Sequence, residues 1–134
     1  MLFIQCQIMT IKDVSFDISV AHRKYYIYGK NLIGLEHGDG AKFDKLPLLM
    51  ANDKPKEWAA TKYRYWYLHH IHHKVKHKWL DGKNYIGVTV EYMRSPSGTD
   101  SWHNRKGITG VQKAVEGFIH SKYSGQIARL VHYF

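Results

Sequence analysis

The sequence has very little cysteine: Cys6 is the only one among 134 residues. A single cysteine cannot form an intrachain disulfide, and it excludes a zinc site built from several thiolates. Proline is also scarce, with 3 residues, and no repeat, low-complexity tract or Pro/Gly/Ser-rich linker divides the chain. We therefore expect a single domain over residues 1–134 and a reducing, cytoplasmic location.

The chain also lacks a hydrophobic run long enough to cross a bilayer. Its apolar start, "MLFIQCQIM", is far shorter than the ~20 residues of a membrane helix, and no basic residues precede it as in a signal peptide. We expect a buried strand here and no membrane partner. Hydrophobic residues make up 44% of the chain and aromatic residues 14%, which is enough for a folded core and excludes a disordered protein.

Acidic residues are few. The chain has 11 Asp and Glu against 20 Lys and Arg, which gives a net charge of +9. Such a charge attracts polyanions such as nucleic acid or phosphorylated substrates, although basic proteins also use charge for solubility. The segments "HRKYYIYGK" (22–30) and "KYRYWY" (62–67) combine Lys and Arg with aromatic rings. This mixture is found in nucleic-acid interfaces, where bases stack on rings, and also in ordinary half-buried strands.

The first half of the chain predicts strands followed by two short helices. Residues 13–20 alternate apolar and polar, and residues 23–37 predict two strands around a turn at Gly29, Lys30 and Asn31. A short helix is expected within 43–53, with Pro47 in its first turn. Asp53 is a candidate N-cap for the next helix, which has Pro55 at its start.

The second half predicts more strands and one longer helix. Strands are expected over 63–70, 75–79 and 85–93, the last two joined by a turn in "LDGKN". In residues 110–122, "GVQKAVEGFIHSK", apolar residues recur with the i, i+3, i+4 spacing of an amphipathic helix, and "QIARLVHYF" predicts a final strand. The expected fold class is α+β, mostly strands with two or three helices.

Histidines gather in one stretch. "YWYLHHIHHKVKHKW" (65–79) holds five of the chain's ten histidines. In an extended segment His70 and His72 point to one face, with Cα atoms roughly 6.5–7 Å apart, so both imidazoles can reach one metal or two adjacent metals. His69 points the other way. Surface polarity is the alternative reading of the same cluster.

His37 ends another apolar strand, in "NLIGLEHGD". Strand ends are common positions for site residues, because a rigid element carries the side chain and the following loop opens the site. Together, His37, His70 and His72 form a candidate metal site. Asp39 has two possible roles. It orients His37 or a bound water, or it caps the turn that follows the strand.

Three segments, "LIGLEHGDGAKFDKLPLLMA", "KYRYWYLHHIHHK" and "MRSPSGTDSWHNRKGITGVQKA", resemble the C-terminal half of calcineurin-like metallophosphoesterases. The similarity extends from about Arg23 to the end and is greatest to the DNA-repair exonuclease-like branch of phages and bacteria. It implies half of a layered sandwich of sheets and helices that hydrolyses phosphodiesters with Mn²⁺, Zn²⁺ or similar ions.

The resemblance also implies roles for individual residues. In that family a strand-ending "HG" supplies one metal ligand and a Gly-His-x-His motif supplies two more, which correspond to His37, His70 and His72. His37 and His70 would share one ion, with His72 on its neighbour. Asp100 and His103, in "SGTDSWHNRKG", match a polar segment of the branch and would approach the site or the substrate. Loop polarity alone also accounts for them.

The sequence departs from the family pattern at two points. His69 stands where Gly-His-x-His has its glycine, and the family's N-terminal Asp-x-His, Gly-Asp-x-x-Asp and Gly-Asn-His-Asp motifs are absent. The resemblance therefore implies half of a two-metal nuclease site, inactive in isolation and completed by a partner chain. The alternative is a non-catalytic basic protein that binds DNA, or assembles as a homo-oligomer that covers exposed sheet edges.

Overall fold

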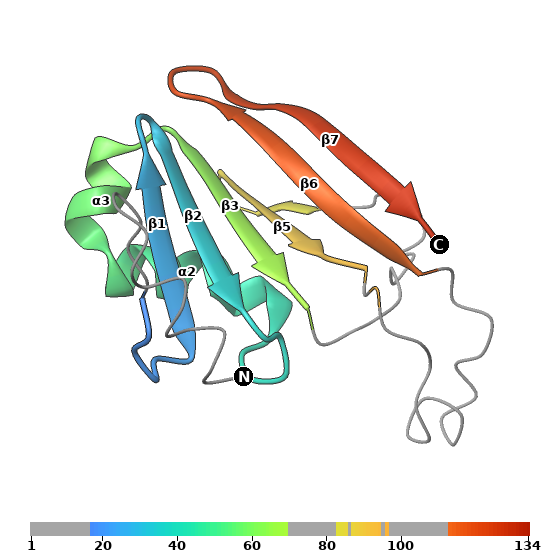
Figure 1. Ribbon diagram of the computed structural model, residues 1–134. Helices are drawn as coiled ribbons and strands as arrows, with labels where there is room; N and C mark the ends of the chain where they lie inside the picture. Colours follow the sequence, from blue (N-terminus) through green and yellow to red (C-terminus); the bar gives the residue numbers. More distant parts are fainter. Residues whose placement is uncertain (1–16, 70–82, 86, 95, 97–112) are drawn as a thin grey trace.

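The computed structural model describes residues 17–69, 83–85, 87–94, 96 and 113–134, with the side chains of 83–85 left out. These residues form two sheets, two α-helices and one 3₁₀ helix (Figure 1). In chain order the elements are β1 (Arg23–Tyr28), β2 (Asn31–Glu36), η1 (Phe43–Lys45), α2 (Leu46–Asp53), α3 (Pro55–Ala60), β3 (Tyr63–Leu68), β4 (Lys83–Tyr85), β5 (Val88–Tyr92), β6 (Ala114–Ser121) and β7 (Gly125–Tyr133). The predicted α+β class, with mostly strands and two helices, is confirmed.

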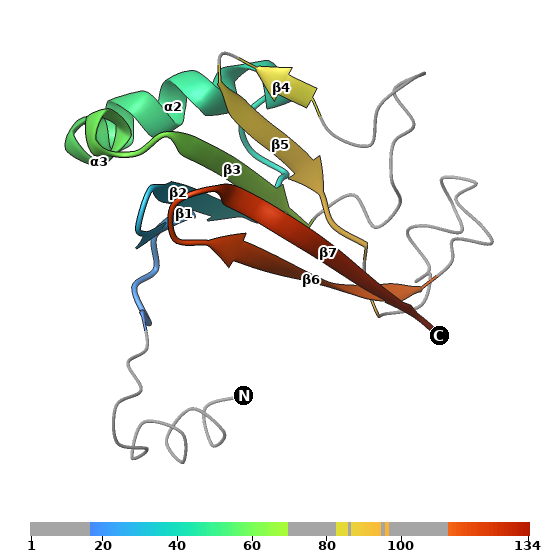
Figure 2. The same ribbon diagram turned by 90° about the horizontal axis from the view of Figure 1, so that it is seen from above.

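The larger sheet has five strands in the order β1-β2-β3-β5-β4. β1 and β2 pair antiparallel, whereas β2, β3 and β5 run parallel to one another. η1, α2 and α3 connect β2 to β3, as a parallel connection requires, and cover one face of the sheet (Figure 2). The carboxyl ends of β2 and β3 therefore meet at one edge of the sheet.

The first hairpin is confirmed where the sequence predicts it. Tyr28 pairs with Asn31, so Gly29 and Lys30 form the turn. Gly29 has φ +56°, and a Cβ there would lie 2.2 Å from the carbonyl oxygen of Lys122. Only glycine combines this backbone angle with so close an approach of a second segment.

Both short helices are confirmed, each with proline in its first turn: Pro47 in α2 and Pro55 in α3. The predicted capping role of Asp53 is wrong. Lys54 is the N-cap of α3 and makes no side-chain cap. The Asp53 carboxylate instead accepts hydrogen bonds of 2.8 Å from Arg23 and from the Tyr25 hydroxyl, and so ties α2 to the edge strand.

The main core lies between the helices and the sheet. Trp66 is fully buried at its centre, where its indole N–H donates to the carbonyl oxygen of Leu46 at 3.0 Å and Tyr25 packs edge-on against its ring. The other buried members of this cluster are Leu32, Leu46, Met50, Leu68, Val88 and Val90.

The predicted helix over 110–122 is wrong in its described part, because β6 occupies Ala114–Ser121 and pairs antiparallel with β7. The two strands form a ribbon on the second face of the sheet (Figure 2). Phe118 stacks on Tyr67 with ring centroids 4.4 Å apart, and the Tyr67 hydroxyl donates to Gln126 at 2.8 Å. Helices, sheet and ribbon thus make three layers.

Other strand predictions have mixed outcomes. β3 and β5 lie within the predicted segments, and β7 begins one residue before the predicted segment 126–134. Residues 17–20, the described part of the predicted strand 13–20, form no strand. Lys83 and Asn84, predicted within the "LDGKN" turn, belong to β4, and Gly87, with φ +73°, lies in the turn between β4 and β5. The predicted strand 75–79 lies outside the described residues. No helix in the described part of the chain is long and apolar enough to span a membrane.

Candidate functional site

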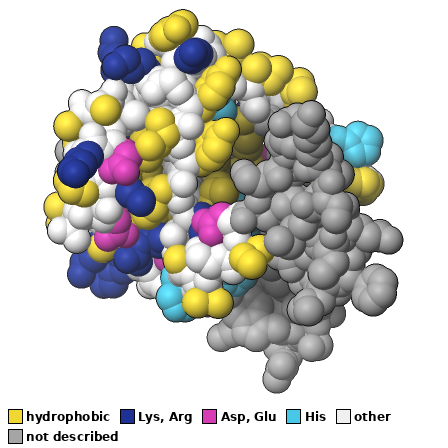
Figure 3. Space-filling model, turned by 60° about the vertical axis from the view of Figure 1, so that its left-hand side comes forward, with side chains coloured by type: hydrophobic (Ala, Val, Ile, Leu, Met, Phe, Trp, Pro, Cys, Tyr) yellow, Lys and Arg dark blue, Asp and Glu magenta, His cyan; other side chains and the backbone are white. Residues whose placement is uncertain are grey.

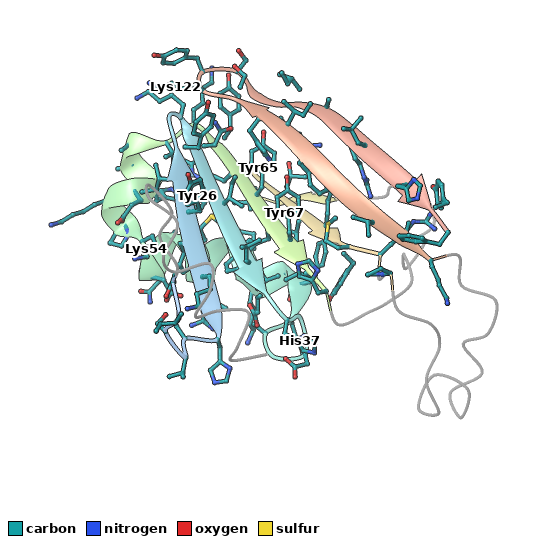
Figure 4. All side chains as sticks on the ribbon, in the orientation of Figure 1. Tyr26, His37, Lys54, Tyr65, Tyr67 and Lys122 are labelled. Carbon is teal, nitrogen blue, oxygen red and sulfur yellow. The ribbon has the colours of Figure 1, made fainter. Side chains whose placement is uncertain are left out.

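Two histidines lie side by side where the parallel strands β2 and β3 end. Glu36 and Leu68, the last residues of these strands, are partners in the register. The next residues are His37 and His69, and the backbone N–H of His69 donates to the carbonyl oxygen of His37 at 3.0 Å. Figure 4 shows His37 at this end of the sheet. We name this region the carboxyl edge.

The environment of His69 favours its neutral form. Desolvation by the surrounding protein, and then the proximity of His37, lower the pKa of His69. Bringing two imidazoles close together makes it costly to protonate both. The neutral form of imidazole is the one that binds a metal ion, but His69 is not one of the three predicted ligands.

A pocket of about 390 Å³ opens beside the carboxyl edge. It contains two of the predicted site residues, His37 and Asp39, both with exposed side chains. The complete lining is His22, Arg23, Glu36, His37, Asp39, Gly40 and Ala41. The pocket therefore joins imidazoles, carboxylates and one guanidinium at the place where the sequence predicts a metal ligand.

Arg23 is held in this lining by Asp53, the last residue of α2. Its Nε donates to Asp53 at 2.8 Å, and this ion pair raises the pKa of the guanidinium. The cation is therefore fixed at the pocket by an acid that lies outside the pocket lining.

Glu36 is a site residue that the sequence analysis missed. It is 7% exposed, and its Oε2 has no hydrogen-bond partner within the described parts of the chain. A Cβ at residue 40 would lie 3.1 Å from Glu36 Oε1, so the loop backbone passes close to this carboxylate. The alternation of side chains in β2 could have indicated that Glu36 is buried, because Leu32 and Glu36 fall on the same, inward face of the strand.

The remaining predicted site residues are His70, His72, Asp100 and His103, and they lie outside the described residues. Within the described residues, no three His, Cys, Asp or Glu side chains are grouped so as to hold a metal ion. The set of His37, His70 and His72 therefore stays a prediction. What the structure adds is that β3 brings the start of the histidine stretch, at His69, next to His37.

No family model, curated protein or solved structure matches this chain. The resemblance to metallophosphoesterases thus rests on the quoted segments alone. Function has to be argued from the geometry of the carboxyl edge and from the chemistry of its side chains.

Imidazole nitrogen and carboxylate oxygen are both ligands for divalent ions of the zinc or manganese type. His37, Asp39 and Glu36 line one pocket, but among the described residues they do not form a group of three side chains placed to hold a metal ion.

Proposed function

We propose that this chain carries the histidine half of a metal-dependent phosphodiester-hydrolysing site, of the kind found in nucleases. The observation that carries the proposal is the 3.0 Å backbone hydrogen bond between His69 and His37, which joins two histidine-bearing strand ends. His37, His70 and His72 would hold Mn²⁺, Zn²⁺ or a similar ion. Such an ion would polarise the phosphate and supply a bound hydroxide.

The protein's own groups would position the substrate. Arg23, fixed by Asp53, presents a permanent cation to an anionic phosphodiester at the pocket. Asp39 lies in the same pocket and can orient His37 or a bound water. Asp100 and His103 are proposed to approach the substrate from their polar segment. Nucleic acid is the preferred substrate because the net charge of +9 attracts polyanions.

The proposal includes a second chain. The carboxylates that would bridge two metal ions are missing from the sequence, so we infer that an N-terminal-half partner supplies them and that the isolated chain is inactive. The sheet and ribbon would then form half of a metallophosphoesterase-type sandwich. A cytoplasmic location belongs to the same proposal.

The test is hydrolysis of bis(p-nitrophenyl) phosphate with Mn²⁺, with and without the product of a neighbouring gene that encodes the three missing motifs. We expect hydrolysis only with both chains, and loss of it in His37→Ala, His70→Ala and His72→Ala. His132→Ala, on the exposed part of β7, is the control and should keep activity. Activity that survives all three ligand substitutions would refute the proposal.

A non-catalytic role in assembly is the second candidate, favoured by the free surface of the ribbon. Ile127 and Leu130 of β7 are 63% and 62% exposed, and Phe134 is 69% exposed. A long edge strand with apolar side chains is suited to pairing with another copy. Light scattering, combined with a calorimetric metal titration, separates the two candidates. Concentration-dependent dimers that bind no metal would favour assembly, whereas monomers that bind metal would favour the enzyme half.

A further inference from the structure

Three lysines from distant parts of the chain meet at the end of the sheet opposite the carboxyl edge. The backbone N–H of Lys30 donates to the carbonyl oxygen of Lys122 at 2.8 Å, and that of Lys62 donates to the carbonyl oxygen of Lys30 at 3.0 Å. Lys30 lies in the β1–β2 turn, Lys62 directly before β3 and Lys122 in the β6–β7 turn. Figure 4 shows Lys122 and His37 at opposite ends of the molecule.

This arrangement is fixed by a buried amide. The side-chain nitrogen of Asn31, a fully buried residue, donates to the carbonyl oxygens of Tyr28 at 2.7 Å and of Ser121 at 2.8 Å. The same side chain thus links the first turn to the ribbon turn. Gly29 permits the close approach, since a Cβ there would collide with Lys122. The lysine backbones are therefore held together by the fold.

The three lysine side chains are exposed and remain open to an anion. None of them forms an ion pair with the acidic residues that the structure describes. Lys62 lies over the Tyr63 ring at 5.5 Å and Lys122 over the Tyr123 ring at 5.7 Å, while Lys30 reaches the carbonyl oxygen of Ala60 at 3.3 Å.

Exposed tyrosine rings lie on the β6–β7 turn and on the strand β1 that leads into the first turn. Tyr123 is 69% exposed, and Tyr26 and Tyr28 are 62% and 42% exposed. Tyr26 and Tyr28 alternate with Tyr25, which faces the helices, so both point to the ribbon side of the edge strand β1. In Figure 3 the upper end of the molecule shows Lys and Arg side chains next to side chains of the hydrophobic class, which includes tyrosine. We call Lys30, Lys62, Lys122, Tyr26, Tyr28 and Tyr123 the lysine–tyrosine surface.

We propose that the lysine–tyrosine surface binds single-stranded nucleic acid. Clustered lysines attract phosphates, and exposed rings beside them give unpaired bases a surface for stacking. A duplex keeps its bases stacked inside and cannot use the rings in this way. The ligand class follows from the charge and the rings alone, so the inference does not depend on the metal chemistry proposed for the carboxyl edge.

The experiment measures binding of the full chain to fluorescein-labelled oligo(dT) by anisotropy, in EDTA, over a range of salt concentrations. The test variant is Lys30→Ala/Lys62→Ala/Lys122→Ala. The matched control is Lys42→Ala/Lys45→Ala/Lys56→Ala, which removes the same charge from three exposed lysines on the helix side. Tyr123→Ala tests stacking without changing charge, and circular dichroism verifies that each variant is folded.

We expect the test variant to lose at least tenfold in affinity and its salt slope to fall by about 2, as the loss of three phosphate contacts on a single strand predicts. The control variant should keep the wild-type slope, and Tyr123→Ala should bind about fivefold more weakly or worse. Equal losses of affinity in the two lysine variants would show that binding depends only on net charge, and would overturn the proposal. Equal competition by duplex DNA, or binding only to anionic lipid vesicles, would also overturn it.

Failure of this test and failure of the proposed hydrolysis are distinguishable. Oligonucleotide binding in EDTA reports the lysine–tyrosine surface alone, whereas the effect of His37→Ala on hydrolysis reports the carboxyl edge. We expect His37→Ala to bind oligo(dT) as wild type does, because His37 lies at the other end of the sheet.

Discussion

Gly34 in β2 and Trp66 in β3 are cross-strand partners on the helix face of the sheet. A Cβ on residue 34 would lie 2.6 Å from the Trp66 ring, so the indole occupies the space that a side chain would need. Trp66 is fully buried and its N–H is already bonded to Leu46, so the ring cannot move aside without losing that hydrogen bond. The glycine is therefore required for packing of the core.

Gly34→Ala is expected to lower the free energy of unfolding by about 1–3 kcal/mol, as overpacking of a full core does. Urea denaturation followed by tryptophan fluorescence measures the change. Gly117→Ala is the matched control, because it also lies within a strand but has nothing within 4 Å of the added Cβ. Equal destabilisation by the two substitutions would show that the Trp66 contact is not the cause.

Asp53 gives the stability a defined dependence on pH. Burial acts to raise the pKa of its carboxyl group, but hydrogen bonds from Arg23 and Tyr25 outweigh burial and lower the pKa below the usual 3.8. A carboxylate with a lowered folded-state pKa stabilises the fold above pH 3.8, and this contribution is lost as the pH falls through the folded value. Asp53→Asn should be less stable than wild type near neutral pH.

The stability difference between wild type and Asp53→Asn should shrink as the pH is lowered below about 4, where both side chains become neutral. Urea unfolding at several pH values measures it. Asp44→Asn, an exposed acid in η1, serves as the control and should follow wild type at every pH. A difference that stays constant down to acid pH would contradict the proposed ion pair.

Among the elements, β6 of the ribbon is the one for which the sequence pattern predicted the wrong type, a helix instead of a strand. Val111, Ala114, Val115, Phe118 and Ile119 have helical spacing, but Ala114 and Phe118 also alternate with Val115 and Ile119 across a strand. Both faces of β6 are partly apolar, so periodicity alone does not decide between the two. Pairing with β7 decides it. The pair Ser124 and Gly125, with Gly125 at φ +82°, was the hairpin signal that could have revealed the turn.

A buried ion network fastens the ribbon to the sheet. The Glu116 side chain is fully buried and pairs with Arg129 of β7 and, at 3.6 Å, with Arg94. Arg129 also reaches Glu91 of β5 at 3.1 Å. No hydrophobic pattern predicts this arrangement, because it places charged residues at inward positions of three separate segments.

Removing one member of that network should be costly. Glu116→Leu leaves the partly exposed Arg129 with Glu91 as its acid and removes the partner of Arg94, and we expect a loss of about 1–3 kcal/mol in the free energy of unfolding. Chemical denaturation measures this loss. Val115→Leu, the outward-facing neighbour, should change stability by less than about 0.5 kcal/mol. A Glu116→Leu protein as stable as wild type would mean that the ion network does not help to hold the ribbon on the sheet.

For the whole molecule, local signals predicted many of the elements, though not β4 or β6, and non-local pairing brought the candidate site residues together. Glycine at the first turn and proline at the helix starts were sufficient to place β1, β2, α2 and α3. The sequence also indicated His37 as a strand-end residue. The parallel pairing of β2 with β3, which brings His69 to His37, joins strands 32 positions apart in register and leaves no local signal. The convergence of Lys30, Lys62 and Lys122 depends on two such long-range backbone hydrogen bonds.

We propose that the carboxyl edge binds a divalent metal through His37. Calorimetric titration of Zn²⁺ into the wild-type chain, His37→Ala and His132→Ala tests this proposal. His132→Ala is the matched control, because it also replaces an imidazole by alanine but lies on β7. We expect saturable binding that weakens at least about tenfold in His37→Ala and is unchanged in His132→Ala. Equal binding in all three proteins, or none in the wild type, would contradict it.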